Sequence, residues 1–246
     1  MNHEFNEKFI PHARFSTSFE TPTLSELSAD PSGVEGFNED LKPQSAVNFE
    51  LGAKGLINNE LQYEFAIFRI NTTNEILPFE VSDRTFFRNA GKTIRNGLET
   101  ALIYIPAQNW QLAANYTFSD FYFKDYSRTD FFFDGEKLPG IPMHSGALSV
   151  RYISPKGIFF KLTGQQVGQL FADDFNSVEV DAYTLLNLNF GYEVLTKKIK
   201  WIPFFGINNL LNSKYNDNIR INAFGDRFYE PAPGINFFGG IRVRIE

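Results

Sequence analysis

The chain has 246 residues, no cysteine and a formal net charge of -6. Its mean hydropathy is -0.25, and no apolar run approaches the ~18 residues that a membrane-spanning helix needs. This composition excludes a helical membrane protein, a disulfide framework and thiolate metal sites, and the acidic balance without a basic patch argues against nucleic acid as a partner.

Short segments with alternating apolar and polar residues follow one another along the chain. In chain order, clear examples lie at residues 13–19, 47–54, 61–67, 110–119, 148–152, 186–193 and 241–246. A period of two places the apolar side chains on one face of a strand and the polar ones on the other. The pattern predicts about ten strands of this kind, which is typical of a transmembrane β-barrel.

In such a barrel the polar faces of the strands would line the interior. The residues that we expect there are Glu50, Asn115, Thr117, Arg151, Lys161, Gln165, Asn187, Asn189, Arg242 and Arg244. Glycines inside the predicted strands mark bends or close approaches of neighbouring groups on a curved sheet. These glycines are Gly52, Gly97, Gly146, Gly164, Gly239 and Gly240.

The connections between the predicted strands alternate in length. Tight turns at 55–59, 106–109, 154–157 and 196–198 alternate with longer connections at 20–43, 72–84, 124–141, 171–178 and 215–233. Outer-membrane barrels have short turns on the periplasmic side and long loops outside. Aromatic residues beside the tight turns, such as Trp110 and Tyr152, fit the ring of aromatics that these barrels place at the membrane interface.

Two other architectures remain open on this evidence. A small self-contained barrel of about ten strands, acting as a pore, an adhesin or a rim-site hydrolase, would pair the strand near Phe15 with the strand near Val243. A soluble β-sandwich would show the same alternation and would bury Trp110, Tyr116 and Phe190 in its core.

Particular stretches of the sequence resemble a known family. They are FETPTLSEL at 19–27, LKPQ at 41–44, NFELG at 48–52, RNAGK at 88–92, LPGIPMH at 138–144, NNLLNSKY at 208–215 and EPAPGINFFGG at 230–240. In this order, and over nearly the whole chain, they resemble the barrel of TonB-dependent outer-membrane receptors. One departure is the terminus, because such barrels usually end on an aromatic residue and this chain ends Ile245-Glu246.

The resemblance implies an all-β fold, a transmembrane antiparallel up-and-down β-barrel, of which this chain would supply about ten of about 22 strands. Residues 1–246 would be the C-terminal portion of that barrel, with the plug domain and the signal peptide absent, and the polar N-terminus agrees with this. The implied function is a siderophore receptor and iron transporter in the outer membrane of a Gram-negative bacterium. The implied partners are outer-membrane lipid, the plug domain of the same receptor, the energy-coupling TonB protein and a small-molecule ligand such as a ferric siderophore.

No residue pattern indicates catalysis or a resident metal or cofactor. The histidines His3, His12 and His144 lack the spacing of a zinc site. His144 with Asp120 would imitate the dyad of a barrel hydrolase, but a structural role is favoured for this histidine. Asp173 and Asp174 lack calcium-loop spacing, so we interpret them as part of a solvated acidic loop. We therefore expect that the chain is not an enzyme and binds no cofactor.

The predicted external loop after residue 121 is rich in aromatic residues. Tyr122, Tyr126, Arg128 and Phe132 are our candidate ligand-binding residues, because rings and a guanidinium can contact an iron chelate. Packing of these rings within the loop is the alternative. The segment 20–44 contains no histidine, and under the resemblance this disfavours haem and leaves a ferric siderophore as the expected ligand.

Overall fold

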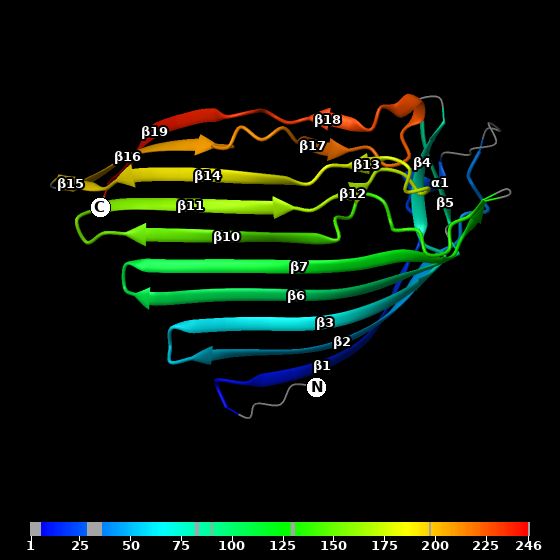
Figure 1. Cartoon of the computed structure of the whole chain (residues 1–246), viewed down its shortest axis with the longest axis horizontal. Coiled ribbons are helices and arrows are strands. Elements are labelled where there is room, and N and C mark those ends of the chain that lie inside the picture. The colour runs from blue at the N-terminus through cyan, green and yellow to red at the C-terminus, as the bar shows by residue number, and fades with distance from the viewer. Residues whose placement is uncertain are drawn as a thin grey trace.

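One antiparallel sheet dominates the computed structural model, which describes residues 6–28, 36–81, 84–89, 91–128, 131–196 and 198–245 (Figure 1). Its strands are β1 (Ile10–Glu20), β2 (Gln44–Ile57), β3 (Leu61–Thr73), β6 (Lys92–Ala107), β7 (Trp110–Asp125), β10 (His144–Ile153), β11 (Ile158–Val167), β14 (Tyr183–Tyr192), β15 (Val194–Thr196), β16 (Ile199–Asn208) and β19 (Asn236–Ile245). Each strand pairs with the next long strand along the chain, which confirms the predicted up-and-down order.

The eleven strands described in this sheet occupy ten positions side by side, because β14 and β15 lie one after the other at the same position. Both pair with β16, and only Glu193 separates them. Within the described residues, no helix has the length and apolar character needed to cross a membrane. The helical segments there are α1 (Leu24–Leu27) and η1 (Phe224–Asp226).

The two edges of the sheet do not meet among the described residues. β1 pairs with β2 and β19 pairs with β16, so the pairing of Phe15 with Val243 that a small closed barrel requires is not formed. The described residues do not form a sandwich either, because one curved sheet carries all of their long strands. The arrangement is an open sector of a barrel wall.

The strand register gathers the apolar residues on one face of this sheet. One continuous row of directly paired residues runs from β7 to β19 and consists of Leu112, Val150, Leu162, Leu188, Ile207 and Phe237. The neighbouring row on the opposite face begins with Gln111, Arg151, Lys161 and Asn189. The register puts all the predicted interior residues on this polar face.

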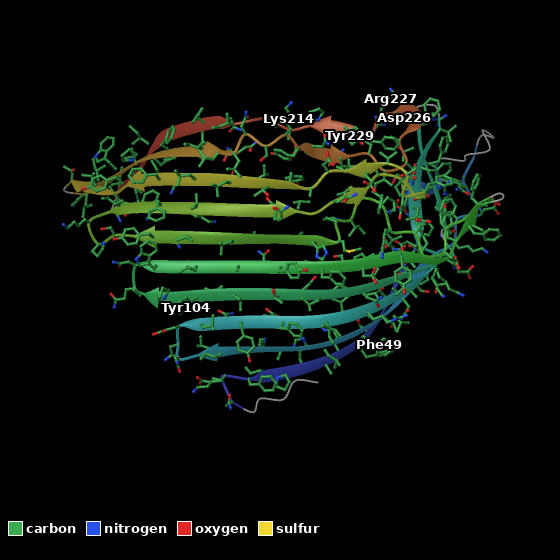
Figure 2. All side chains as sticks on the ribbon, viewed as in Figure 1. Phe49, Tyr104, Lys214, Asp226, Arg227 and Tyr229 are labelled. Atoms are coloured by element: carbon green, nitrogen blue, oxygen red, sulfur yellow. The ribbon has the colours of Figure 1, made fainter. Side chains whose placement is uncertain are left out.

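The polar face is the concave one. Two hollows along the sheet are lined by its residues, one beside Glu50 and Glu64 and another beside Arg151 and Lys161. The opposite face exposes large apolar side chains, among them Phe49, which Figure 2 labels at the β2 edge of the sheet. A wall that is apolar outside and polar inside is the arrangement that a membrane barrel requires.

Aromatic rings line the end of the apolar face beside the short turns, as predicted. The ring centroids of Trp110 and Tyr152 are 4.7 Å apart, and Phe160 lies 5.7 Å from Tyr152. These residues come from three adjacent strands, so they form a continuous row at one level. Rings at one level near the strand ends suit a membrane interface.

Several of the strand glycines leave room for a ring on the neighbouring strand. A Cβ added at Gly97 would lie 2.2 Å from the Phe68 ring, and one at Gly52 would lie 2.4 Å from the ring of His12. The predicted close approach is therefore confirmed at these positions. No close approach of this kind occurs at Gly164, where an added Cβ would meet nothing closer than 3.8 Å.

The turn between β10 and β11 provides a test of backbone strain. Gly157 has φ +89°, and an added Cβ would lie 2.3 Å from the carbonyl oxygen of Glu193. We expect Gly157→Ala to lower the free energy of unfolding by about 1–2 kcal/mol for the left-handed backbone and a further 1–3 kcal/mol for the clash. The measurement is the urea midpoint of the full-length receptor that contains this chain, refolded in detergent.

Gly135→Ala is the matched control for that prediction. Gly135 has φ +90° and nothing within 4 Å of an added Cβ, so it carries the backbone cost without the clash. The steric account is wrong if the two variants shift the urea midpoint equally.

Candidate functional site

The long connections gather at one end of the sheet, as the alternation in loop length predicts (Figure 1). They contain short hairpins of their own: β4 (Ile76–Val81) with β5 (Arg84–Asn89), β8 (Ser127–Arg128) with β9 (Phe131–Phe132), β12 (Leu170–Phe171) with β13 (Glu179–Val180), and β17 (Asn216–Ile219) with β18 (Tyr229–Pro231). These hairpins form a layer over the strand ends, which we call the loop layer.

A buried carboxylate ties the loop layer together. Asp174, between β12 and β13, is 1% exposed. Its Oδ2 lies 3.0 Å from Nη2 of Arg88 on β5, and its Oδ1 accepts a 2.9 Å hydrogen bond from Nδ2 of Asn222. The Oη of Tyr126 donates to Oδ2 at 3.4 Å. One side chain therefore joins segments from four different connections between long strands.

Arg88 is itself held between aromatic rings. Its Cζ lies 4.4 Å from the centroid of the Phe79 ring and 5.8 Å from that of Tyr126. A guanidinium over a ring gains cation–π attraction, and the planar group leaves its N–H donors for Asp174. The charge pair is thus enclosed by apolar surface, where its electrostatic interaction is strong.

Two apolar clusters fill the loop layer. The first consists of Phe123, Tyr126, Phe133 and Leu138, and the second of Ala172, Val180, Ala223 and Phe228. Tyr126 belongs to the first cluster and also reaches Asp174, so packing and the polar network are connected. The loops on this end have a core of their own, which suits a surface that must hold a fixed shape.

The predicted ligand-binding residues differ in exposure where their side chains are described. Tyr126 is 4% exposed and lies inside the first cluster, whereas Phe132 is 82% exposed on β9. Tyr122 is half-buried, with Nζ of Lys137 5.7 Å from its ring centroid. The backbone of Arg128 lies on β8, and its side chain is outside the described residues. Ring packing within the loop, the alternative interpretation, therefore accounts for Tyr126.

The prediction of a solvated acidic loop at residues 173–174 is wrong. Asp173 is 7% exposed, and its carboxylate accepts hydrogen bonds from the backbone N–H groups of Ser177 and Val178, both at 2.9 Å. Adjacent aspartates are usually solvated. Here Asp173 closes a turn through these backbone hydrogen bonds, and Asp174 pairs with Arg88. Among the described residues, no group of three or more His, Asp or Glu side chains is arranged to hold a metal ion.

The rim histidine has a partner other than Asp120. Nδ1 of His144 lies 2.8 Å from Oη of Tyr116, and its ring also contacts the ring of Phe118. Asp120 forms an ion pair with Lys137. Because the His144 ring and the Asp120 carboxylate have separate partners, they do not form a dyad. His144 instead packs at the loop end of the apolar face.

A hollow of about 890 Å³ lies between hairpins of the loop layer and the adjoining ends of β11 and β14. We call it the mouth hollow. Its lining includes residues of β12, β13, β14 and the connection between β16 and β19, among them Tyr183, Tyr215 and Tyr229. The rings of Tyr183 and Tyr215 are 4.9 Å apart. Figure 2 labels Lys214 and Tyr229 of this lining beside β17 and β18, away from Tyr104 near the short turns.

The charges of the mouth hollow are mainly negative. Glu179, Asp181 and Asp217 contribute carboxylates, and Lys214 contributes an ammonium group. An excess of one sign in a hollow raises the local concentration of ligands of the opposite sign. Tyrosine rings beside these charges provide apolar contact surface with a polar tip, as small-molecule sites commonly do.

The comparison with known families decides the identity of the fold. Residues 2–210 match the family described as TonB dependent receptor-like, beta-barrel. The chain belongs to the TonB-dependent receptors. This confirms the resemblance read from the sequence and the barrel-wall interpretation of the sheet.

Relatives within the TonB-dependent receptors support the assignment. The chain is 25% identical over 217 residues to the ferrioxamine B receptor of Salmonella typhimurium, a match that covers 86% of this chain and 29% of that protein. Among solved structures it is similar to the siderophore receptor PiuA of Acinetobacter baumannii, with 21% identity, a TM-score of 0.76, and coverage of 98% of this chain and 34% of that one. It is also similar to the ferric-catecholate import receptor Fiu of E. coli K12, with 20% identity, a TM-score of 0.72, and coverage of 98% and 33%.

The chain therefore spans less than a third of the length of this curated relative. In this sector of a TonB-dependent receptor barrel, the mouth hollow lies among the long loops at one end of the sheet. Sequence reasoning missed this hollow, although NNLLNSKY at 208–215 contributes part of its lining. Those residues were informative as family features, but nothing in their pattern indicates that they meet Glu179 and Tyr183.

Proposed function

We propose that the chain forms part of the wall and the outer loops of an outer-membrane receptor that takes up an iron-siderophore or a similar metal chelate in a Gram-negative bacterium. The observation that carries this proposal is the mouth hollow, which lies at the loop end of a wall that is apolar on one face and polar on the other. Family membership, together with the similarity to a ferrioxamine B receptor and a ferric-catecholate import receptor, supports the choice of ligand class.

In this proposal residues 1–246 are the C-terminal portion of the barrel. The apolar face contacts outer-membrane lipid, and the concave polar face surrounds a plug domain of the same receptor. Energy for uptake comes through the TonB protein, which pulls on that plug. The chain contributes binding surface and passage and no catalytic group, in keeping with the TonB-dependent receptors as a family of receptors and transporters.

Ligand contact is proposed at two places on the loop end. The mouth hollow offers Tyr183, Tyr215 and Tyr229, and the β8–β9 hairpin offers the exposed ring of Phe132 and carries Arg128, the other predicted contact in this hairpin. The carboxylates of the hollow favour a chelate that carries a positive charge. Tyr122, whose ring lies 5.7 Å from Nζ of Lys137, is a further proposed contact, and Tyr126 packs inside the loop layer.

Tyr229→Ala tests the mouth hollow as the binding site. We expect about tenfold weaker binding of the ligand, equivalent to about 1.4 kcal/mol, because an aromatic contact surface is lost. The measurement is a fluorescence-quenching titration of the full-length receptor with ferrioxamine B, and in parallel with a ferric catecholate.

Tyr104→Ala is the control, since Tyr104 is 40% exposed and Tyr229 is 45% exposed, but Tyr104 lies at the opposite end of the sheet (Figure 2). Equal weakening by both variants would contradict the location of the site. If the wild-type receptor binds neither ferrioxamine B nor the ferric catecholate, the proposed ligand class is contradicted.

A further inference from the structure

Tyrosine rings from three segments line the mouth hollow. Tyr183 begins β14 and Tyr215 directly precedes β17, and the planes of their two rings are inclined by 32° at a centroid distance of 4.9 Å. Tyr229 on β18 completes the set, and its Oη donates a 3.4 Å hydrogen bond to the carbonyl oxygen of Glu179. Contacts between segments therefore hold these rings in place, and the face of such a ring attracts cations.

The carboxylates of the mouth hollow are accessible and uncompensated. Glu179, Asp181 and Asp217 are all exposed. In the described part of the chain, none of the ion pairs involves these three side chains, and Lys214, which shares the lining, pairs with none of them. Asp217 also interacts electrostatically with the hydroxyl of Tyr183. Negative charge thus lies beside the tyrosine pair with nothing to neutralise it there.

The arrangement of these carboxylates does not suit a bare metal ion. A divalent cation needs several oxygen ligands that converge on it at about 2.0–2.6 Å, and the described residues contain no group of three or more His, Asp or Glu side chains that could hold one. An organic cation has a different requirement, since one carboxylate and an aromatic surface are enough to hold it. The tyrosine pair and the dispersed carboxylates together therefore favour an organic cation.

We propose that the mouth hollow recognises an alkylammonium group of its ligand. The ammonium would lie over the rings of Tyr183 and Tyr215 and donate hydrogen bonds to the carboxylate of Asp217, while the alkyl stem contacts the rings. This inference rests on the proposed receptor function. It adds that the receptor selects among metal chelates by a cationic arm, at a place separate from the metal centre of the chelate.

The test uses n-butylammonium and its neutral analogue butan-1-ol as probes, with the full-length receptor that contains this chain in an uncharged detergent. Saturation-transfer NMR titrations measure the binding of each probe. We expect saturable binding of n-butylammonium, at least about fivefold tighter than that of butan-1-ol. Asp217→Asn should weaken n-butylammonium binding by about two- to fivefold without changing the volume of the exposed side chain.

Two replacements of Tyr215 test the contribution of the ring. Tyr215→Leu keeps an apolar side chain but removes the π face, so n-butylammonium binding should weaken by about fivefold. Tyr215→Phe keeps the π face and removes only the hydroxyl, so it should retain the binding that the leucine variant loses. Equal binding by the leucine and phenylalanine variants would overturn the role of the tyrosine pair.

Asp226→Asn is the matched control for Asp217→Asn. Asp226 is exposed in the same connection between β16 and β19 but does not line the mouth hollow. Its φ is +59°, a conformation that asparagine also adopts readily. This variant should bind n-butylammonium like the wild type. Equal weakening by the two variants, or equal binding of the two probes to the wild type, would overturn the inference.

Ferric-chelate binding to the same preparation separates the inference from the proposed function. Chelate binding without a preference for n-butylammonium over butan-1-ol removes only the ammonium site. Binding of n-butylammonium that depends on Asp217 and Tyr215, without binding of either ferric chelate, removes the proposed chelate receptor and leaves the ammonium site.

Discussion

Replacement of Asp174 by alanine is expected to loosen the whole loop layer of the receptor. The variant leaves Arg88 buried against Phe79 without its carboxylate partner, and it also removes the acceptor for Asn222. Breaking a buried ion pair in this way costs about 3–5 kcal/mol, because the remaining charge is neither solvated nor paired. Hydrogen exchange of loop-layer amides, followed by mass spectrometry on the full-length receptor, measures the loss as local opening.

The barrel strands should keep their protection in this variant, since Asp174 contacts the loops and not the strand ladder. Asp125→Ala is the matched control. Its carboxylate lies 3.3 Å from Nζ of Lys92, but these side chains are 70% and 55% exposed, and exposed pairs contribute about 0–1 kcal/mol. Equal loss of protection in the two variants would show that Asp174 does not organise the loops.

Replacement of Leu188 by arginine is the second large expected effect. Leu188 lies near the middle of β14 on the apolar face, paired with Leu162 and Ile207. An arginine facing lipid near the bilayer midplane lowers barrel stability by about 2–4 kcal/mol. The measurement is the urea midpoint of the full-length receptor refolded into lipid vesicles.

Asn189→Arg is the control on the opposite face of the same strand. Asn189 pairs with Lys161 and Gly206 on the polar face, so an arginine there meets water or polar groups and should lower stability by no more than the roughly 0.2–1 kcal/mol of a like charge opposite Lys161. Similar losses at both positions would contradict the orientation of the wall.

Much of the fold could be predicted from the sequence because its signals are local. The period-two alternation in 186–193 fixes which side chains share a face, and the turn at 154–157 fixes which strands are neighbours. The alternation in loop length then places the long connections at one end. The architecture of the wall follows from these short-range rules and the outward apolar band.

The loop layer could not be predicted in the same way, because its contacts join segments far apart in the chain. Asp174 meets Arg88 across 86 positions, and no periodicity marks such a pair. The sequence pattern predicts a solvated loop at residues 173–174 and a ligand contact at Tyr126. Tertiary packing instead buries all three side chains.

The central claim is that the apolar face of this sheet meets lipid and its polar face does not. The most direct test is spin labelling at each position from Leu186 to Asn189 in the full-length receptor, reconstituted in vesicles, with collision rates measured for oxygen and for a water-soluble nickel chelate. We expect strict alternation along β14, with oxygen collisions favoured at Leu186 and Leu188 and disfavoured at Asn187 and Asn189. Equal access of the nickel chelate to all of these positions would contradict it.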